Sequence, residues 1–253
     1  MSKITLVTGA TSGIGRACSE KFASLGYDLI ITGRRIERLK DFEKYLMNTF
    51  QIKVLSLSFD VRNQKEVEKS IGGLDENWKQ IDILVNNAGL ALGLSTIDQG
   101  LLEDWEQMID TNLKGLLYVS KAVIPIMIQR RSGHVINIGS IAGREVYPKG
   151  NVYCATKHAV RAISQGMRVD LVQHGIKVTE VSPGAANTEF SIVRFHGDRQ
   201  AADNVYVGFE PLSAGDVANV VGFVATLPRH VNINEIVVVP AAQASSTIIN
   251  REM

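Results

Sequence analysis

A tyrosine and a lysine four residues apart, Tyr153 and Lys157, have the types and spacing that proton transfer needs. In a helical stretch this spacing places both side chains on one face of the helix. A free tyrosine has a pKa of about 10 and is a poor base near neutrality, but a neighbouring ammonium favours its phenolate form. A tyrosine ring packed on the aliphatic stem of a lysine is the structural alternative. Other residues must therefore decide between the two interpretations.

A serine adds to this pair. Ser140 directly follows the segment Ile136–Gly139, whose start belongs to a short apolar run typical of a buried parallel strand. Ligands of parallel sheets bind beyond the carboxyl ends of the strands. A hydroxyl at that place can hydrogen-bond a substrate oxygen that changes between alcohol and carbonyl. Its alternative role is that of a turn or N-cap serine.

A glycine-rich loop follows the first apolar run, Ile4–Val7, and precedes the first amphipathic stretch. Glycine permits the φ values of such a turn and lets a pyrophosphate approach the N–H groups of a helix N-terminus. An ordinary tight turn is the alternative, but the position after the first strand favours a dinucleotide site. The expected contacts are Gly9, Thr11, Ser12, Gly13, Ile14 and Gly15.

The expected end of the second strand holds Gly33, followed by Arg34 and Arg35. An Asp or Glu at this place usually holds a free ribose 2′-hydroxyl, whereas a guanidinium group suits a 2′-phosphate. The sequence therefore predicts NADP(H) rather than NAD(H) as the cofactor. The alternative is that the two arginines only form the solvated first turn of the next helix.

The elements that position these residues alternate between short apolar runs and longer amphipathic stretches. The expected strands are Ile4–Val7, Leu29–Ile31, Val54–Leu57, Ile83–Val85, Val135–Ile138, Val178–Val181 and Ile236–Val239. The expected helices are Gly15–Leu25, Glu37–Phe50, Lys65–Ile71, Glu103–Gln129, Val152–Val172 and Ser213–Thr226. This alternation predicts an α/β fold of the Rossmann type, a doubly wound, seven-stranded parallel sheet with helices on both faces.

Length and composition limit the possible classes of protein. The chain has 253 residues, 45% of them hydrophobic and 21% charged, which suits one domain over residues 1–253. The long segment at about 183–211 does not fit the alternation and is expected to be a substrate lid. A net charge of +1 with scattered basic residues gives no support for a nucleic-acid or membrane surface.

The cysteines and histidines indicate neither a disulfide framework nor a metal site. Cys18 and Cys154 are the chain's two cysteines, and its five histidines have no ligand spacing. No secretory signal or membrane span is evident in the sequence. We therefore expect a reducing, cytoplasmic setting and no metal.

Taken in order, these motifs resemble the short-chain dehydrogenase/reductase family along the whole chain. The motifs that carry the resemblance are Thr8-Gly9 to Gly15, Asp60-Val61, Asn86 to Gly89, Asn112, Ser140, Tyr153 with Lys157, and Pro183-Gly184 with Thr188. The resemblance implies that Tyr153 is the acid/base, that Ser140 polarises the reacting oxygen and that Lys157 holds the nicotinamide ribose and lowers the pKa of the tyrosine. It also implies that Asn112 holds a water in a proton relay from Lys157. Since asparagine is a poor helix former, a local break there is expected.

The same resemblance implies further cofactor contacts. Two lie near the adenine, Asp60 and Val61. The others are Asn87, Ala88 and Gly89 at the adenosine ribose, and Pro183, Gly184 and Thr188 beside the nicotinamide. It also implies a homotetramer built on the two longest helical stretches.

Within the family, the chain is most similar to the NADP-dependent dehydrogenases of 3-hydroxy acids, serine and L-allo-threonine. Such substrates carry a carboxylate, so Arg144 and Arg194 are candidates for a substrate-binding clamp. A surface position for Arg144, or a lid or subunit salt bridge for Arg194, is the alternative. Two other functions stay open: a reductase of uncharged ketones or aldehydes, and a cofactor-binding scaffold without catalysis.

Overall fold

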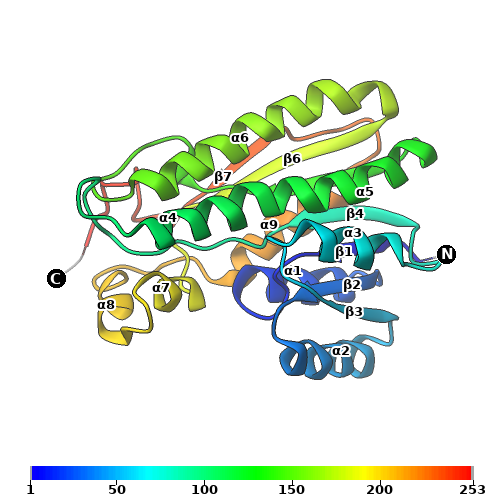
Figure 1. Ribbon diagram of the computed structural model, residues 1–253, viewed down its shortest axis with the longest axis horizontal. Coiled ribbons are helices and arrows are strands. Elements are labelled where there is room, and N and C mark those ends of the chain that lie inside the picture. The colour runs from blue at the N-terminus through cyan, green and yellow to red at the C-terminus, as the bar shows by residue number, and fades with distance from the viewer. Residues whose placement is uncertain (1, 252–253) are drawn as a thin grey trace.

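Short runs of aliphatic and β-branched residues form a parallel sheet in the computed structural model, which describes residues 2–251 (Figure 1). The strands are β1 (Ile4–Val7), β2 (Asp28–Gly33), β3 (Val54–Ser58), β4 (Ile81–Asn86), β5 (Gly133–Ile138), β6 (Ile176–Pro183) and β7 (Glu235–Val238). They pair in the order β3-β2-β1-β4-β5-β6-β7, and every pairing is parallel. The predicted single-domain, doubly wound, seven-stranded sheet is therefore confirmed, with its order reversing between β1 and β4.

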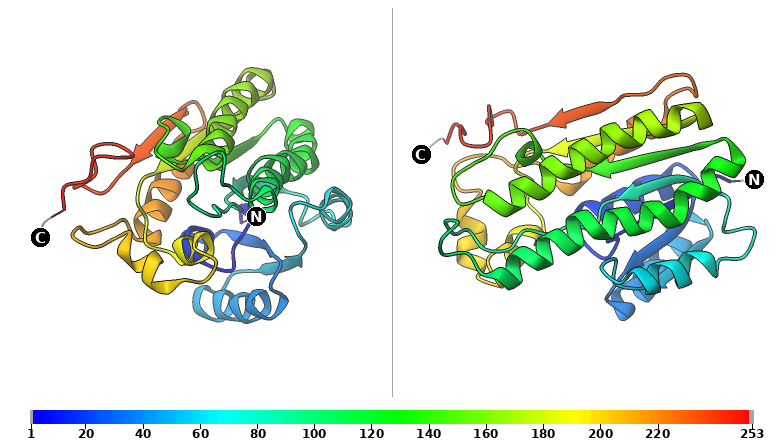
Figure 2. Two further views of the ribbon diagram at one scale, coloured as in Figure 1. Left: turned by 60° about the vertical axis from the view of Figure 1, so that its left-hand side comes forward. Right: turned by 45° about the horizontal axis from the view of Figure 1, so that its top comes forward.

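Helices cover both faces of the sheet (Figures 1 and 2). The longer ones are α1 (Gly13–Ser24), α2 (Ile36–Phe50), α3 (Gln64–Gly72), α4 (Leu102–Ile109), α5 (Leu116–Arg130), α6 (Asn151–Leu171) and α9 (Ala214–Thr226). Helices α1, α2 and α9 bury apolar side chains against one face, and α3, α5 and α6 bury theirs against the other. In residues 2–251, no helix combines the length and apolar character needed to cross a membrane.

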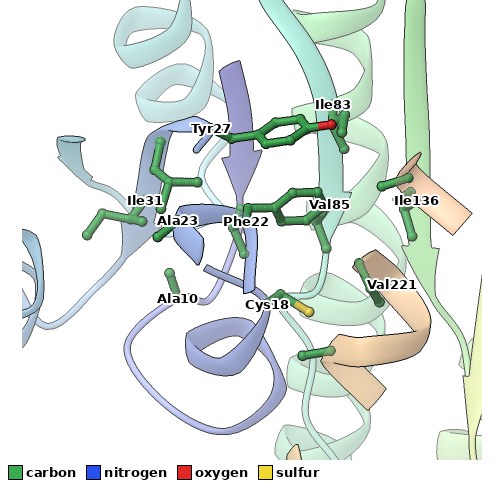
Figure 3. Close-up of a cluster of buried hydrophobic side chains, with 14 of the residues drawn as sticks. Ala10, Cys18, Phe22, Ala23, Tyr27, Ile31, Ile83, Val85, Ile136 and Val221 are labelled. Carbon is green, nitrogen blue, oxygen red and sulfur yellow. The ribbon is translucent and has the colours of Figure 1, made fainter. Parts of the chain in front are cut away.

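The core under α1 fixes the position of the glycine-rich loop (Figure 3). Phe22 and Cys18 of α1 are fully buried and lie in one cluster with Val85 of β4 and Val221 of α9. Burying an aromatic or aliphatic side chain of this size stabilises the fold by about 1.5–3 kcal/mol. This packing holds the N-terminus of α1 at the carboxyl end of β1.

The helical stretch expected over Glu103–Gln129 is interrupted. A π-helical turn, η1 (Asp110–Gly115), separates α4 from α5. Asn112 lies in this turn, and its Oδ1 accepts a hydrogen bond from Leu90 N while its Nδ2 donates to Leu90 O, both at 2.8 Å. Because asparagine bonds neighbouring backbone in place of the regular helix ladder, the break occurs where it was expected.

The segment after β6 contains two short helices, α7 (Glu189–Arg194) and α8 (Arg199–Asn204). Both lie at the end of the molecule toward which the C-terminal residues run (Figures 1 and 2). Two turns of 3₁₀ helix complete the described elements, η2 (Ile141–Gly143) after β5 and η3 (Val172–His174) after α6.

Candidate active site

A cavity of about 570 Å³ opens at the carboxyl ends of the strands. Its walls include residues that directly follow β1, β2, β4, β5 and β6, together with α7 and part of the C-terminal segment. This is the place where doubly wound sheets bind ligands, and the volume is within the usual range for small-molecule sites.

Most of the site residues predicted from the sequence line this one cavity. They are Gly9, Thr11, Ser12, Gly13, Ile14, Arg34, Arg35, Asp60, Val61, Asn87, Ala88, Gly89, Ser140, Tyr153, Lys157, Pro183, Gly184, Thr188 and Arg194. Gly15, Asn112 and Arg144 do not line it. Gly15 packs against the end of β4, since a Cβ there would clash with Asn87 Nδ2. Asn112 lies behind the wall, where its Nδ2 also donates to Thr156 Oγ1 at 3.1 Å.

The glycine-rich loop has the conformation that a phosphate-binding turn needs. Gly9 and Gly13 have φ values of 66° and 51°, which favour glycine. Ser12 is the N-cap residue of α1, and its side chain makes no capping bond with the described residues. The N–H groups of the first turn are thus able to bind an anion.

Three arginines gather beyond the end of β2. Arg35 Nη2 donates to Thr11 Oγ1 at 2.7 Å and to Ser12 Oγ at 3.0 Å. Arg34 Nη1 lies 3.8 Å from Asp60 Oδ2. Arg38, on the first turn of α2, was not among the predicted residues. It follows Arg35 by three residues and Arg34 by four, a spacing that brings helical side chains together and could have indicated it. This group fits a 2′-phosphate, and the strand end itself holds Gly33 rather than a carboxylate.

A carboxylate from α7 pairs with two of these arginines. Glu189 Oε2 lies 3.1 Å from Arg35 Nη1, and its Oε1 lies 3.1 Å from Arg38 Nη1. Partial burial acts to raise the pKa of Glu189, but the two guanidinium groups outweigh it and hold the pKa below its ordinary value. This contact was not predictable from the sequence, because α7 and α2 are far apart along the chain.

The first half of α6 brings Tyr153 and Lys157 into the cavity, where they are 8% and 6% exposed. Lys157 Nζ donates to Ile138 O at 3.0 Å and lies 6.0 Å from the centroid of the Tyr153 ring. Ser140 Oγ accepts a hydrogen bond from Ala142 N at 3.1 Å, so the serine caps η2. Ser140 and Tyr153 both line the cavity. The capping position thus holds the serine beside the tyrosine.

Burial controls the protonation of both α6 side chains. It raises the pKa of Tyr153, as does the neighbouring Tyr147, while the Ser140 hydroxyl and Arg194 act to lower it. Burial also lowers the pKa of Lys157 to about 8, against the opposing charge of Glu180. The phenol therefore holds its proton until additional positive charge or hydrogen bonding favours the phenolate.

Arg194 of α7 lies next to the tyrosine. Its Cζ is 5.7 Å from the centroid of the Tyr153 ring and 5.4 Å from that of Tyr147. Arg194 O accepts a hydrogen bond from Gly93 N at 2.9 Å, which connects α7 to the segment after β4. Within residues 2–251, no carboxylate forms an ion pair with Arg194.

The structure does not bring Arg144 to the cavity. Its guanidinium group pairs with Glu235 of β7, a carboxylate that Arg161 and Arg168 also contact. Because β7 is the edge strand, this ion pair holds the Arg144 side chain at the edge of the sheet and away from the cavity. Of the two arginines proposed for substrate binding, only Arg194 faces the reacting end of the cavity.

Sequence reasoning also missed other wall residues, among them Tyr147 and Gln243. Tyr147 lines the cavity beside Tyr153, and Gln243 lies where the C-terminal segment covers Gly184. Gln243 Oε1 accepts a hydrogen bond from Ala185 N at 2.8 Å. A second tyrosine close to Tyr153 was a usable signal, but nothing in the sequence near Gln243 marks it.

Comparisons with known proteins agree with this geometry. The family model for short chain dehydrogenases matches residues 3–198. The NADP-dependent 3-hydroxy acid dehydrogenase YdfG of Salmonella typhi is 47% identical over 242 residues, covering 95% of this chain and 96% of the relative. Sulfoacetaldehyde reductase 2 of Chromohalobacter salexigens is 45% identical over 247 residues, covering 97% of each. The closed form of a serine dehydrogenase complexed with NADP+ superposes with a TM-score of 0.93 at 44% identity, covering 99% of this chain and 100% of that one.

Proposed function

This chain belongs to the short-chain dehydrogenase family and is an NADP-dependent oxidoreductase acting on CH–OH groups, and we propose that its substrate is a small 3-hydroxy acid or 2-amino-3-hydroxy acid. Serine, L-allo-threonine and the pair 3-hydroxypropionate/malonic semialdehyde are the compounds to be tested. The observation that carries this proposal is Arg194, a cation without a carboxylate partner among the described residues, next to Tyr153.

Bound NADP supplies the hydride acceptor for oxidation, and its reduced form supplies the donor for reduction. The residues that would hold it are Gly9, Thr11, Ser12, Gly13 and Ile14 of the glycine-rich loop, Arg34 and Arg35 at the 2′-phosphate, and the wall residues Asp60, Val61, Asn87, Ala88, Gly89, Pro183, Gly184 and Thr188. The positive-φ glycines and the arginine group support this placement.

In the proposed chemistry, Tyr153 exchanges the proton of the substrate hydroxyl. Ser140 hydrogen-bonds the same oxygen, and Lys157 supplies positive charge behind the phenol. Asn112 holds the start of a proton path, since its π-helical turn places it against Thr156 of α6. The burial of Tyr153, Lys157 and Asn112 strengthens their electrostatic interactions.

Arg194 binds the carboxylate of the substrate in this proposal. A planar guanidinium fork forms paired hydrogen bonds with a carboxylate, and the rings of Tyr147 and Tyr153 hold its plane in place. Segment 183–211 acts as the lid that carries it. Arg144 instead stabilises the sheet through Glu235.

A sulfonated substrate is the second candidate, because a reductase named for sulfoacetaldehyde is 45% identical to this chain. A sulfonate has the same charge as a carboxylate and accepts the same hydrogen bonds from arginine. Reduction of uncharged ketones or aldehydes and a non-catalytic scaffold are the remaining alternatives.

The experiment uses matched substrates that differ only in charge. We would compare 3-hydroxypropionate with its methyl ester as substrates of the wild-type enzyme and of Arg194→Gln, following NADPH by absorbance. Loss of a charged hydrogen-bond partner should lower kcat/KM for the acid by about 10- to 100-fold, with a much smaller effect on the ester.

The control is Arg199→Gln, since Arg199 is an exposed residue of α8 that does not line the cavity. Equal losses on acid and ester would remove the carboxylate role of Arg194. L-serine, L-allo-threonine and sulfoacetaldehyde in the same assay then separate the amino acid, hydroxy acid and sulfonate alternatives.

We further propose that the enzyme acts in the cytoplasm as a homotetramer. Exposed apolar residues on the helices that the family resemblance places at subunit contacts support the assembly: Leu117 on α5 and Val169 on α6 are 40% and 75% exposed. The free thiols of Cys18 and Cys154 suit a reducing compartment. Size-exclusion chromatography with light scattering tests the tetramer.

A further inference from the structure

A row of polar side chains crosses the sheet underneath α6. Asn86, Asn137, Glu180 and Glu235 are direct register partners on β4, β5, β6 and β7. Asn137 Nδ2 donates to Ser164 Oγ of α6 at 2.9 Å, which shows that the row lies on the face covered by α6. Register partners on one face of a sheet are close neighbours, so a charge on one side chain of this row affects the protonation of the others.

Glu180 is the buried charge in this row. Its side chain is fully inaccessible, and its Oε1 accepts a hydrogen bond from Ser182 Oγ at 2.6 Å. Its Oε2 has no hydrogen-bond partner among residues 2–251. Burial raises the pKa of Glu180. A carboxylate in such a place needs compensating positive charge nearby.

Lys157 is a cation on the helix above, and the charge of Glu180 acts to raise its pKa against the effect of burial. Lys157 Nζ donates to Ile138 O, the last residue of β5, at 3.0 Å. The Glu180 carboxylate lies against the next residue, Gly139, where any Cβ would clash with Oε1. The ammonium and the carboxylate therefore flank two consecutive residues at the end of one strand.

Other charged groups act on Glu180 from the sides. Arg144, which follows η2, and Arg161 of α6 favour its ionised form, whereas Glu235 of β7 opposes it. Both arginines also pair with Glu235. Their charge is thus shared, and Lys157 remains the cation that has no ion-pair partner of its own in the described chain.

We propose that Glu180 is a positioning residue that keeps Lys157 protonated from behind the sheet and so sets the pH range in which Tyr153 exchanges its proton. The proposal rests on the proposed roles of Tyr153 and Lys157. A neutral Lys157 would not stabilise a phenolate, and without Glu180 the buried lysine would lose its proton at lower pH.

The first test is a double-mutant cycle on the unfolding temperature of the cofactor-free protein at neutral pH, with Glu180→Gln and Lys157→Met. In the wild-type background, Glu180→Gln removes an attraction. In the Lys157→Met background, it removes a buried charge that has already lost the attraction of Lys157. Glu180→Gln should therefore raise the unfolding temperature more, or lower it less, when Lys157 is already Met. The same change in both backgrounds would overturn the coupling, whatever the enzyme's substrate.

The second test is the pH profile of kcat for alcohol oxidation. Glu180→Gln should move the alkaline limb, where Lys157 loses its proton, to lower pH by about one unit. Glu180→Asp keeps the charge and should restore most of the profile. Glu68→Gln is the control, since Glu68 is an exposed residue of α3 that does not line the cavity, and it should leave the limb in place. An unmoved limb in Glu180→Gln would overturn the proposal.

If Glu180→Gln does not fold, Ser182→Ala takes its place. The serine hydroxyl is the hydrogen-bond donor to the carboxylate, and its loss makes the ionised form of Glu180 less stable. The alkaline limb should then move in the same direction by a smaller amount, and a shift in the opposite direction would contradict the proposal. An enzyme that turns over none of the substrates would overturn the proposed function, while the stability cycle would still test the coupling.

Discussion

Glu189 at the start of α7 and Arg35 at the N-cap of α2 form an ion pair of 3.1 Å although they are 154 residues apart in the chain. Both residues line the cavity. The carboxylate thus binds a guanidinium group that we propose for the 2′-phosphate of NADP. Glu189 of the proposed lid and the 2′-phosphate of the cofactor would therefore compete for Arg35.

This competition predicts that Glu189→Gln tightens binding of 2′,5′-ADP, a molecule that carries the 2′-phosphate without the nicotinamide. Partly exposed ion pairs contribute about 0–1 kcal/mol, so the expected gain in affinity is about two- to fivefold. Isothermal titration calorimetry would measure it, with 5′-AMP as the ligand that should not respond. Glu20→Gln, which removes the equally close Arg16 pair away from the cavity, should change neither affinity. Weaker 2′,5′-ADP binding in Glu189→Gln would contradict the competition.

Cofactor preference should depend on Arg35. Arg35→Ala removes a charged hydrogen-bond donor, so kcat/KM with NADP should fall by about tenfold or more, with little change for NAD. Steady-state kinetics with both cofactors measures this ratio. Lys44→Ala is the control, since Lys44 lies on the same helix, α2, but does not line the cavity. A parallel loss with both cofactors would indicate that Arg35 supports the loop through Thr11 and Ser12 instead.

The central strands β1, β2, β4, β5 and β6 were predictable because each is a short, largely buried run in a parallel sheet, whose apolar composition is set by burial on both faces. The edge strands β3 and β7 are less buried, but their β-branched and aliphatic residues still marked them. The break in the long helix was only partly predictable. Asn112 indicated that regular helix would be disturbed, but the π-helical turn and the bond to Thr156 depend on how α4 packs against α6. Such tertiary contacts leave no local pattern in the sequence.

The catalytic and cofactor candidates could be chosen from the sequence because they lie in local motifs, most of them at strand ends and Tyr153 with Lys157 on one face of a helix. Residues whose role depends on a distant partner were not. Glu189 meets Arg35 only after α7 folds over the sheet edge, and the placement of Arg144 depends on Glu235, 91 residues away. From the sequence, Arg144 and Arg194 were equal candidates for binding a substrate carboxylate. Only the fold shows that Arg194 lines the cavity and that Arg144 pairs with Glu235 instead.

Proton exchange by Tyr153 predicts a large loss on removing its hydroxyl. General acid–base groups contribute about 10²- to 10⁴-fold, so Tyr153→Phe should lower kcat by at least about 100-fold. NADP binding, measured by calorimetry, should change little. Tyr147→Phe is the matched control: its ring also packs on Arg194, yet its hydroxyl has no role in the proposed chemistry. A similar loss in both variants would indicate that the rings act by holding Arg194.

The buried lysine also predicts how stability varies with pH. Burial lowers the pKa of Lys157 from its ordinary value of 10.5 to about 8. Between these two values the unfolded chain binds the proton and the folded chain does not, so the free energy of unfolding rises with pH over this interval. Relative to Lys157→Met, the wild-type protein should gain up to about 3 kcal/mol across it. Urea denaturation of the cofactor-free proteins at a series of alkaline pH values measures the difference. Parallel curves for the two proteins would mean that Lys157 keeps an ordinary pKa in the fold, and a wild-type curve that falls relative to the variant would mean that the fold raises the pKa of Lys157 instead.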